Sequence, residues 1–205
     1  MRLVIDKLKD YYKSLPSTVI RIGDSQRFYP FPRKAKNVGE LFYTERLFDD
    51  KLLWKAETKE GNRQIVVKYM YKYNKDAHEL CFGIKRAPEL LHVEMITCGF
   101  YCVVMEYIEG RRLFECVDLK RSDYDTIIND IEEVVLLLHS KNIVFADLRD
   151  TNILVIQDEN DEYHGMLVDF DWAGVDSVDR YPPLMNPDVN WPDGVQGKSP
   201  GIIVN

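Results

Sequence analysis

The chain has 205 residues, of which 45% are apolar and 30% charged, and its net charge is −7. This length and apolar content can build one large domain or two small lobes around a shared cleft. The acidic balance argues against a broad nucleic-acid surface, which needs clustered Lys and Arg to displace counterions from phosphate. No stretch approaches the ~20 apolar residues that a membrane helix requires. We therefore expect neither nucleic acid nor membrane as a partner.

Cysteine usage favours a reducing compartment. The four cysteines form no CxxC pair, and of the four histidines only His92 lies near Cys98. A disulfide or a zinc site is the less favoured alternative, and we expect small buried core residues instead. The predicted location is intracellular, in the cytoplasm or the nucleus. The residues concerned are Cys81, Cys98, Cys102 and Cys116.

Residues 1–38 are predicted to precede the main fold. The opening segment, MRLVIDKLKDYYKSL, alternates apolar and charged residues, which favours an amphipathic helix over a secretory signal. A connector follows in which Pro30 and Pro32 disfavour both a helix and a central strand. We expect this part to be a helix and a linker.

Residues 39–109 have the pattern of an antiparallel sheet with one helix. β-prone segments alternate with turns, and the turn at 59–62 contains Gly61 and Asn62, which both tolerate positive φ. A helix with apolar residues on one face is predicted between the third and fourth strands. The expected elements are strands at 40–48, 52–58 and 63–71, a helix at 75–86, and two strands within 90–108 that turn at 97–99.

Residues 110–205 are predicted to form a second, reduced lobe that opens at Gly110, which we interpret as a hinge. The segment 122–140 is the strongest predicted helix, and Ser122 with Asp125 resembles a capping box at its start. Two short strands follow, and prolines disfavour a long helix in the last part of the chain. The predicted buried stripe of the helix is Ile127, Ile128, Ile131, Val134, Val135 and Leu138, and the strands are 152–156 and 165–170.

Four features suited to phosphoryl transfer occur in order along the chain. Lys68 ends the apolar strand IVVK, a helix with acidic residues follows, Asp147–Asn152 lies between a long helix and a strand, and Asp169 ends the next strand. The transferred group is highly charged, so a protein mostly positions it and neutralises its charge. A lysine can fix phosphates, an aspartate can accept the proton of the attacking hydroxyl, and Asn and Asp oxygens suit Mg²⁺.

This ordered set resembles the signature motifs of protein kinases. FADLRDTN resembles the catalytic loop and implies Asp147 as the base and Asn152 as a metal ligand. VDFD resembles the metal-binding motif, with Asp169 as the second ligand, and IVVK resembles the strand that carries the phosphate-binding lysine, Lys68. Arg149 lies in the loop and is interpreted as a group that neutralises the transferred phosphate.

Two further assignments rest on the same resemblance. MEYIEG resembles the linker that binds adenine through its backbone, which implies Glu106, Tyr107 and Ile108. The helix after the phosphate-binding lysine should supply an acid that pairs with that lysine. The sequence leaves two alternatives for this acid, Asp76 and Glu79.

A narrower resemblance covers residues 40 to about 200. The DFDWAG and RYP…N…W elements are similar to kinase-like domains that are abundant in fungi, some of which occur in Crinkler-type effector proteins. An effector of this kind would act inside a host cell. The same domains resemble both protein kinases and the small-molecule kinases of aminoglycoside and choline type.

The chain departs from the kinase pattern at three places. The first hairpin, ERLFDDKLL, contains no glycine, although a phosphate-covering loop works through bare backbone. Phe145-Ala146 replaces the usual lead-in to the catalytic aspartate. Asp171 replaces the glycine of the metal motif and is interpreted as a local hydrogen-bonding group or an additional carboxylate. The helix that braces the catalytic loop is also expected to be missing.

The sequence thus predicts an α+β, two-lobed protein-kinase-like fold. We expect a five-stranded antiparallel sheet with one helix in the N-terminal lobe and a truncated helical C-terminal lobe. The resemblance implies an ATP- and Mg²⁺-dependent phosphotransferase that acts on a protein hydroxyl. The alternatives are a pseudokinase, which would bind nucleotide or a protein partner without turnover, and a small-molecule kinase.

Overall fold

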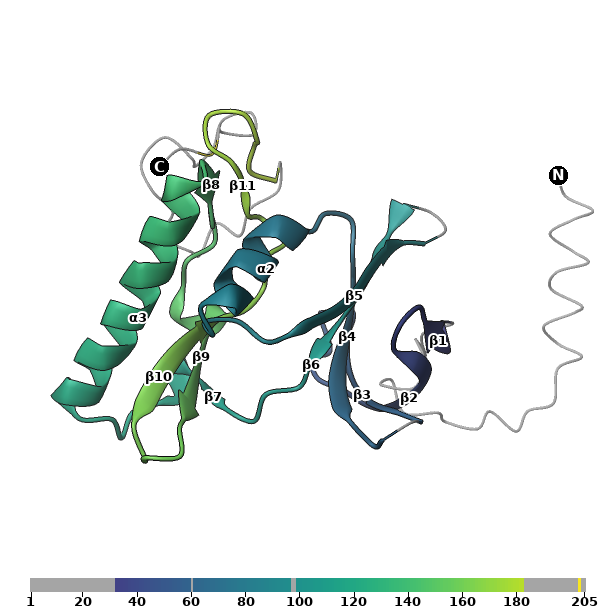
Figure 1. Ribbon diagram of the computed structural model, residues 1–205, viewed down its shortest axis with the longest axis horizontal. Helices are drawn as coiled ribbons and strands as arrows, with labels where there is room; N and C mark the ends of the chain where they lie inside the picture. Colours follow the sequence, from purple (N-terminus) through teal and green to yellow (C-terminus); the bar gives the residue numbers. More distant parts are fainter. Residues whose placement is uncertain (1–31, 60, 97–98, 183–202, 204–205) are drawn as a thin grey trace, which may run out of the picture. The chain divides into compact units, whose positions relative to one another are not determined.

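The computed structural model describes residues 32–59, 61–96, 99–182 and 203. These belong to one compact unit that begins at Pro32 (Figure 1). The predicted N-terminal helix and Cys98 lie outside the described residues, as does most of the chain after Pro182.

The N-terminal part is an antiparallel sheet of six strands in the order β1-β2-β3-β4-β6-β5 (Figure 1). The five predicted strands are confirmed, and β1 adds a short sixth strand from within the predicted connector. The chain can fold back from β1 onto β2 because Asn37 and Gly39 both adopt positive φ. The strands are β1 (Lys34–Ala35), β2 (Gly39–Arg46), β3 (Leu53–Thr58), β4 (Gln64–Met70), β5 (Leu90–Met95) and β6 (Tyr101–Glu106).

The side chains of β4 alternate between two faces that have different surroundings. Ile65, Val67 and Tyr69 are buried in a core on one face of the sheet, together with Trp54 from β3. The residues between them point to the opposite face, since successive side chains of a strand alternate. This register places Lys68 on the face opposite that core.

Helix α2 (Lys75–Gly83) is shorter than the predicted helix at 75–86. Asn74 caps its start, because the Asn74 side chain accepts a hydrogen bond of 2.9 Å from the N–H of Ala77. The helix ends early because Lys85 adopts a φ of 61°, which a right-handed helix cannot contain. Its buried residues are Ala77, His78 and Cys81.

The second lobe is built on helix α3 (Arg121–Ser140), which lies along the hairpin of β9 (Ile153–Gln157) and β10 (Tyr163–Leu167) (Figure 1). Gly165 allows the close contact, since a Cβ at this position would lie 3.1 Å from the Ile127 side chain. Among the described residues, neither helix has the length and apolar content needed to cross a membrane. Short elements complete the lobe: β7 (Arg111–Arg112), β8 (Ile143–Val144), β11 (Gly174–Val175) and the 3₁₀ turns η3 (Leu113–Glu115) and η4 (Asp150–Asn152).

Two details of the predicted second lobe need correction, and a third receives a steric reason. Ile128 is 47% exposed, because the buried stripe of α3 runs through Ile127 and Ile131 on an adjacent face. The capping interaction is made by Asp123, whose carboxylate accepts a hydrogen bond of 2.9 Å from the N–H of Lys120, and not by Ser122 with Asp125. Gly110 packs closely on β9, since a Cβ there would lie 2.7 Å from the carbonyl of Val155. This close contact gives a steric reason for glycine at a position interpreted as a hinge.

An aromatic stack joins the two lobes. The His78 ring of α2 is fully buried and lies parallel to the Phe170 ring, with 4.6 Å between ring centroids. Its Nε2 lies 2.8 Å from the carbonyl of Pro88, and its Nδ1 contacts the Tyr73 hydroxyl. A neutral imidazole satisfies both contacts, with Nε2–H donating to the carbonyl and Nδ1 accepting from the hydroxyl. Burial lowers the pKa of His78 to about 4.

We predict that His78 makes stability fall as the pH drops from about 6.5 to 4. Over this range the unfolded chain protonates the imidazole and the folded chain does not, so the free energy of unfolding decreases by up to about 3 kcal/mol. The measurement is urea unfolding at a series of pH values for wild type and His78→Gln. The variant should lose this part of the pH dependence, whereas the control His139→Gln should keep it. Parallel pH profiles for wild type and His78→Gln would contradict the assignment.

Candidate functional site

A cavity of about 260 Å³ opens between the sheet and the second lobe. One part of its wall is apolar and comes from β3, β4, β6 and β9. The other part is charged or polar and comes from the β2–β3 hairpin, the end of β4 and the segments next to β9 and β10. The apolar wall includes Leu53, Val66, Met105, Leu154 and Val168, and the polar wall includes Lys51, Lys68, Asn152 and Asp169.

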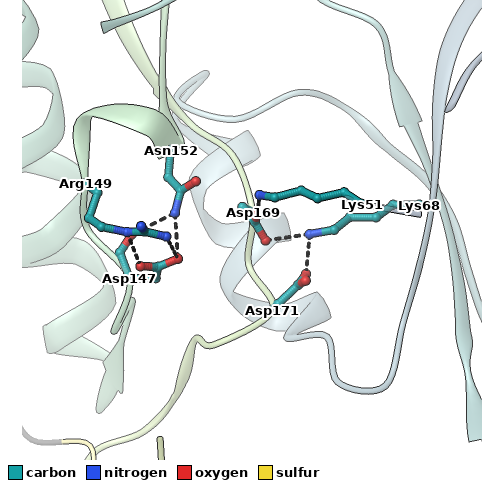
Figure 2. Close-up of polar contacts among 7 residues, drawn as sticks. All are labelled: Lys51, Lys68, Asp147, Arg149, Asn152, Asp169 and Asp171. Atoms are coloured by element: carbon teal, nitrogen blue, oxygen red, sulfur yellow. Dashed lines mark hydrogen bonds and ion pairs between the residues drawn. The ribbon is translucent and has the colours of Figure 1, made fainter. Parts of the chain in front are cut away.

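The ammonium group of Lys68 is the centre of the polar part (Figure 2). Its Nζ lies 2.5 Å from Oδ1 of Asp169 and 2.6 Å from Oδ1 of Asp171, and only 8% of the side chain is exposed. Burial alone would lower the pKa of Lys68, but the two carboxylates raise it. The group therefore stays charged at neutral pH.

The two carboxylates that contact Lys68 have opposite electrostatic surroundings. Burial acts to raise the pKa of Asp169, but Lys68 and Lys51 together hold it well below its usual range. The pKa of Asp171 is raised to about 7, first by burial and then by the neighbouring Asp169 carboxylate, although Lys68 opposes the change. Asp169 is therefore the carboxylate that stays ionised.

Asp169 sits in an unusual backbone conformation, with a φ of 76°. Ala146, just before Asp147, also has positive φ, at 66°. Such conformations cost of order 1–3 kcal/mol and persist where surrounding structure enforces them, often at functional sites. Strain therefore occurs at or next to both predicted aspartates.

Asp147, Arg149 and Asn152 form a second polar group next to the first (Figure 2). Arg149 donates two hydrogen bonds to the Asp147 carboxylate, from Nε at 2.6 Å and from an η nitrogen at 2.8 Å. Asn152 donates from Nδ2 to the Asp147 carbonyl at 3.0 Å and to Oδ2 at 2.8 Å. Both amide hydrogens of Asn152 are thus used, and its Oδ1 remains as an acceptor that points away from Asp147 (Figure 2).

The expected pairing of Lys68 with a helix acid is not found. Asp76 and Glu79 are both exposed on α2, and Glu79 pairs instead with Lys75 at 3.3 Å. The reason is the helical register, because the buried face of this short helix is Ala77, His78 and Cys81. His78 turns inward between the two acids, and Asp171 supplies the second carboxylate to Lys68.

The linker residues Glu106, Tyr107 and Ile108 line the cavity. Sequence reasoning did not find Lys51, whose Nζ lies 3.0 Å from Oδ2 of Asp169. The only signal was the glycine-free hairpin that contains it.

The described cysteines, Cys81, Cys102 and Cys116, are free and buried, in line with the expected core role.

The comparisons with known proteins point to the same fold. No family model matches the chain. A Dictyostelium discoideum protein described as a probable serine/threonine-protein kinase is 29% identical over 115 residues, which is 46% of this chain and 9% of that protein. The chain therefore matches less than a tenth of that relative's length. The structure of the kinase PK-1 of Cydia pomonella granulovirus matches with a TM-score of 0.57 and 17% identity, over 68% of this chain and 54% of the viral one. The predicted protein-kinase-like fold is confirmed.

Removal of the Lys68 charge is predicted to destabilise the fold. Lys68→Met leaves Asp171 buried without its cation, and breaking such a pair costs about 3–5 kcal/mol. Urea unfolding at pH 8 measures the loss. The double variant Lys68→Met/Asp171→Asn should recover part of it, because the second change removes one of the two buried carboxylates that have lost their shared cation. Strictly additive effects of the two changes would show that the contact is not energetically coupled.

Proposed function

We propose that the chain binds ATP with Mg²⁺ in this cavity and transfers a phosphoryl group to a Ser or Thr hydroxyl of a protein. The observation that carries the proposal is the gathering of Lys68, Asn152 and Asp169 from three segments at one cavity, with Asp147 hydrogen-bonded to Asn152. Phosphoryl transfer needs these groups in this combination, because it depends on positioning and charge neutralisation.

The cavity has an apolar part and a positively charged part, as a nucleotide requires. Its apolar wall suits a base, and its lysines lie on the side of Asp169, where phosphates would meet them. The N–H groups of Glu106 and Tyr107 already donate to the carbonyls of Glu89 and Gln64. Of the three linker residues we therefore assign the backbone N–H contact to Ile108.

Two oxygen groups fit a magnesium ion. Asn152 keeps its Oδ1 as an acceptor, and the pKa of Asp169 is held below its usual range by Lys68 and Lys51. Mg²⁺ takes few protein oxygens together with phosphate oxygens and water, so this pair is sufficient. When bound, the ion would neutralise phosphate charge.

The proposed base is Asp147, which would orient the acceptor hydroxyl and take its proton on a carboxylate oxygen. Both of its oxygens accept hydrogen bonds here, from Arg149 and Asn152. Oδ1 of Asp147 has two lone pairs and the contact with Arg149 Nε uses one, so an acceptor hydroxyl can bind the other. If the contact with Arg149 opens, its guanidinium can turn to the transferred phosphoryl group, as the sequence interpretation expects.

A second candidate is a nucleotide-binding module without turnover. The bidentate contact of Arg149 with Asp147 favours it, because this contact occupies the proposed base. The glycine-free hairpin points the same way. A small hydroxyl compound remains the alternative acceptor of the phosphoryl group. The similarity to Crinkler-type fungal domains is proposed from the motifs alone.

We predict that Asp147→Asn lowers phosphate transfer by about 10²–10⁴-fold, because a general base is lost. The measurement is transfer of labelled γ-phosphate with Mg²⁺, to the chain itself, to protein acceptors and to small hydroxyl compounds. ATP binding, followed by thermal shift, should be retained. Asp150→Asn in the same loop is the control and should keep activity.

The outcomes separate the candidates. Unchanged transfer by Asp147→Asn would refute the mechanism. ATP binding by wild type without transfer to any acceptor would favour the non-catalytic module. Transfer to small hydroxyl compounds alone would replace the protein acceptor.

A further inference from the structure

The β2–β3 hairpin carries a lysine into the cavity at the place where a glycine-rich backbone was expected. Residues 47–52 are LFDDKL, and Lys51 lies just before β3. Without glycine this turn has a side chain at every position, which keeps its backbone from the closest approach to phosphates. A long side chain can supply positive charge from a greater distance.

Hydrogen bonds on either side of Lys51 hold the hairpin in place. The carbonyl of Lys51 accepts from Nε of Arg46 at 3.2 Å, and the N–H of Leu47 donates to the carbonyl of Leu53 at 2.9 Å. The carbonyl of Leu52 accepts from the N–H of Tyr69 at 2.9 Å, which ties the turn to β4. The base of the Lys51 side chain is therefore fixed relative to the strand that carries Lys68.

The Lys51 ammonium reaches the polar part of the cavity from this fixed base. Its Nζ contacts Oδ2 of Asp169 at 3.0 Å, while Lys68 contacts Oδ1 of the same carboxylate (Figure 2). The two lysines differ in their surroundings, since the Lys51 side chain is 36% exposed and that of Lys68 is 8% exposed. Lys68 has Asp171 as a further partner.

We propose that Lys51 binds the phosphates of the nucleotide and so replaces, with a side-chain charge, the contribution of a glycine-rich loop. The inference rests on the proposed function and names a residue that the kinase resemblance did not assign. A lysine is suited to this task because its ammonium is a point charge on a flexible stem. From its present position the ammonium can keep Asp169 as a neighbour while it contacts an anion in the cavity.

A purely structural role for Lys51 predicts a different pattern of ligand affinities. If the residue only holds Asp169 and the hairpin in place, its loss should affect every ligand of the cavity alike, including adenosine, which has no phosphate. If it contacts phosphates, the effect should grow with the number of phosphates. The comparison of ATP, ADP, AMP and adenosine therefore separates the two roles.

The test measures dissociation constants of these four compounds by calorimetry, with and without Mg²⁺, for wild type, Lys51→Gln and Lys51→Arg. Lys51→Gln should weaken ATP binding about tenfold or more, which matches the loss of one charge-assisted contact. Its affinity for adenosine should stay within about twofold of wild type. Lys51→Arg should retain most of the ATP affinity. The control is Lys59→Gln on the next hairpin, where Lys59 pairs with Glu40 outside the cavity, and it should bind ATP like wild type.

Adenosine binding also reports whether Lys51→Gln is folded. Equal losses of ATP and adenosine affinity in Lys51→Gln, or unchanged ATP binding, would overturn the phosphate role. ATP binding by wild type would still support the proposed function in that case. Failure of the wild type to bind ATP would overturn both.

Discussion

The arrangement of the site depends on one buried positive charge, the ammonium of Lys68. A cation with 8% of its side chain exposed needs nearby negative charge, which Asp169 provides at 2.5 Å, and Asp171 adds a second contact at 2.6 Å. Because both carboxylates come from the segment after β10, the sheet of the first lobe is tied directly to the second lobe. Phe170, between the two aspartates, extends this connection into the core by its stack on His78.

The strands and the order of the motifs could be predicted because they depend on local signals. β4 is apolar at its centre and flanked by turns, so its position and that of Lys68 follow from the sequence. Asp147 and Asn152 were correctly expected to share a loop, since five residues separate them and the Asn152 side chain bonds back to Asp147. The comparisons support the fold at the same coarse level.

The remaining features depend on packing between distant segments, which spacing does not encode. Periodicity indicated the helix α2 and its apolar face, but the kinase resemblance placed Asp76 or Glu79 at the site, and the inward position of His78 was not expected. Lys51 lies 118 residues from Asp169 in the sequence, and no local pattern signals that contact. The role of Asp171 was left open because a carboxylate that replaces glycine can either bond locally or bind a ligand.

Because His78 and not an acid faces inward, a displacement of α2 acts on the site in a different way. Where a helix acid holds the lysine, displacement of the helix breaks an ion pair, and the charge balance of the site changes with it. Here Asn74, at the start of α2, is bonded to the carbonyls of Phe170 and Ala173, and an uncharged ring stack joins the helix to the same segment. Movement of α2 would thus pull on the backbone that carries the aspartates without first breaking an ion pair of the helix itself. Regulation through this helix would be mechanical rather than electrostatic.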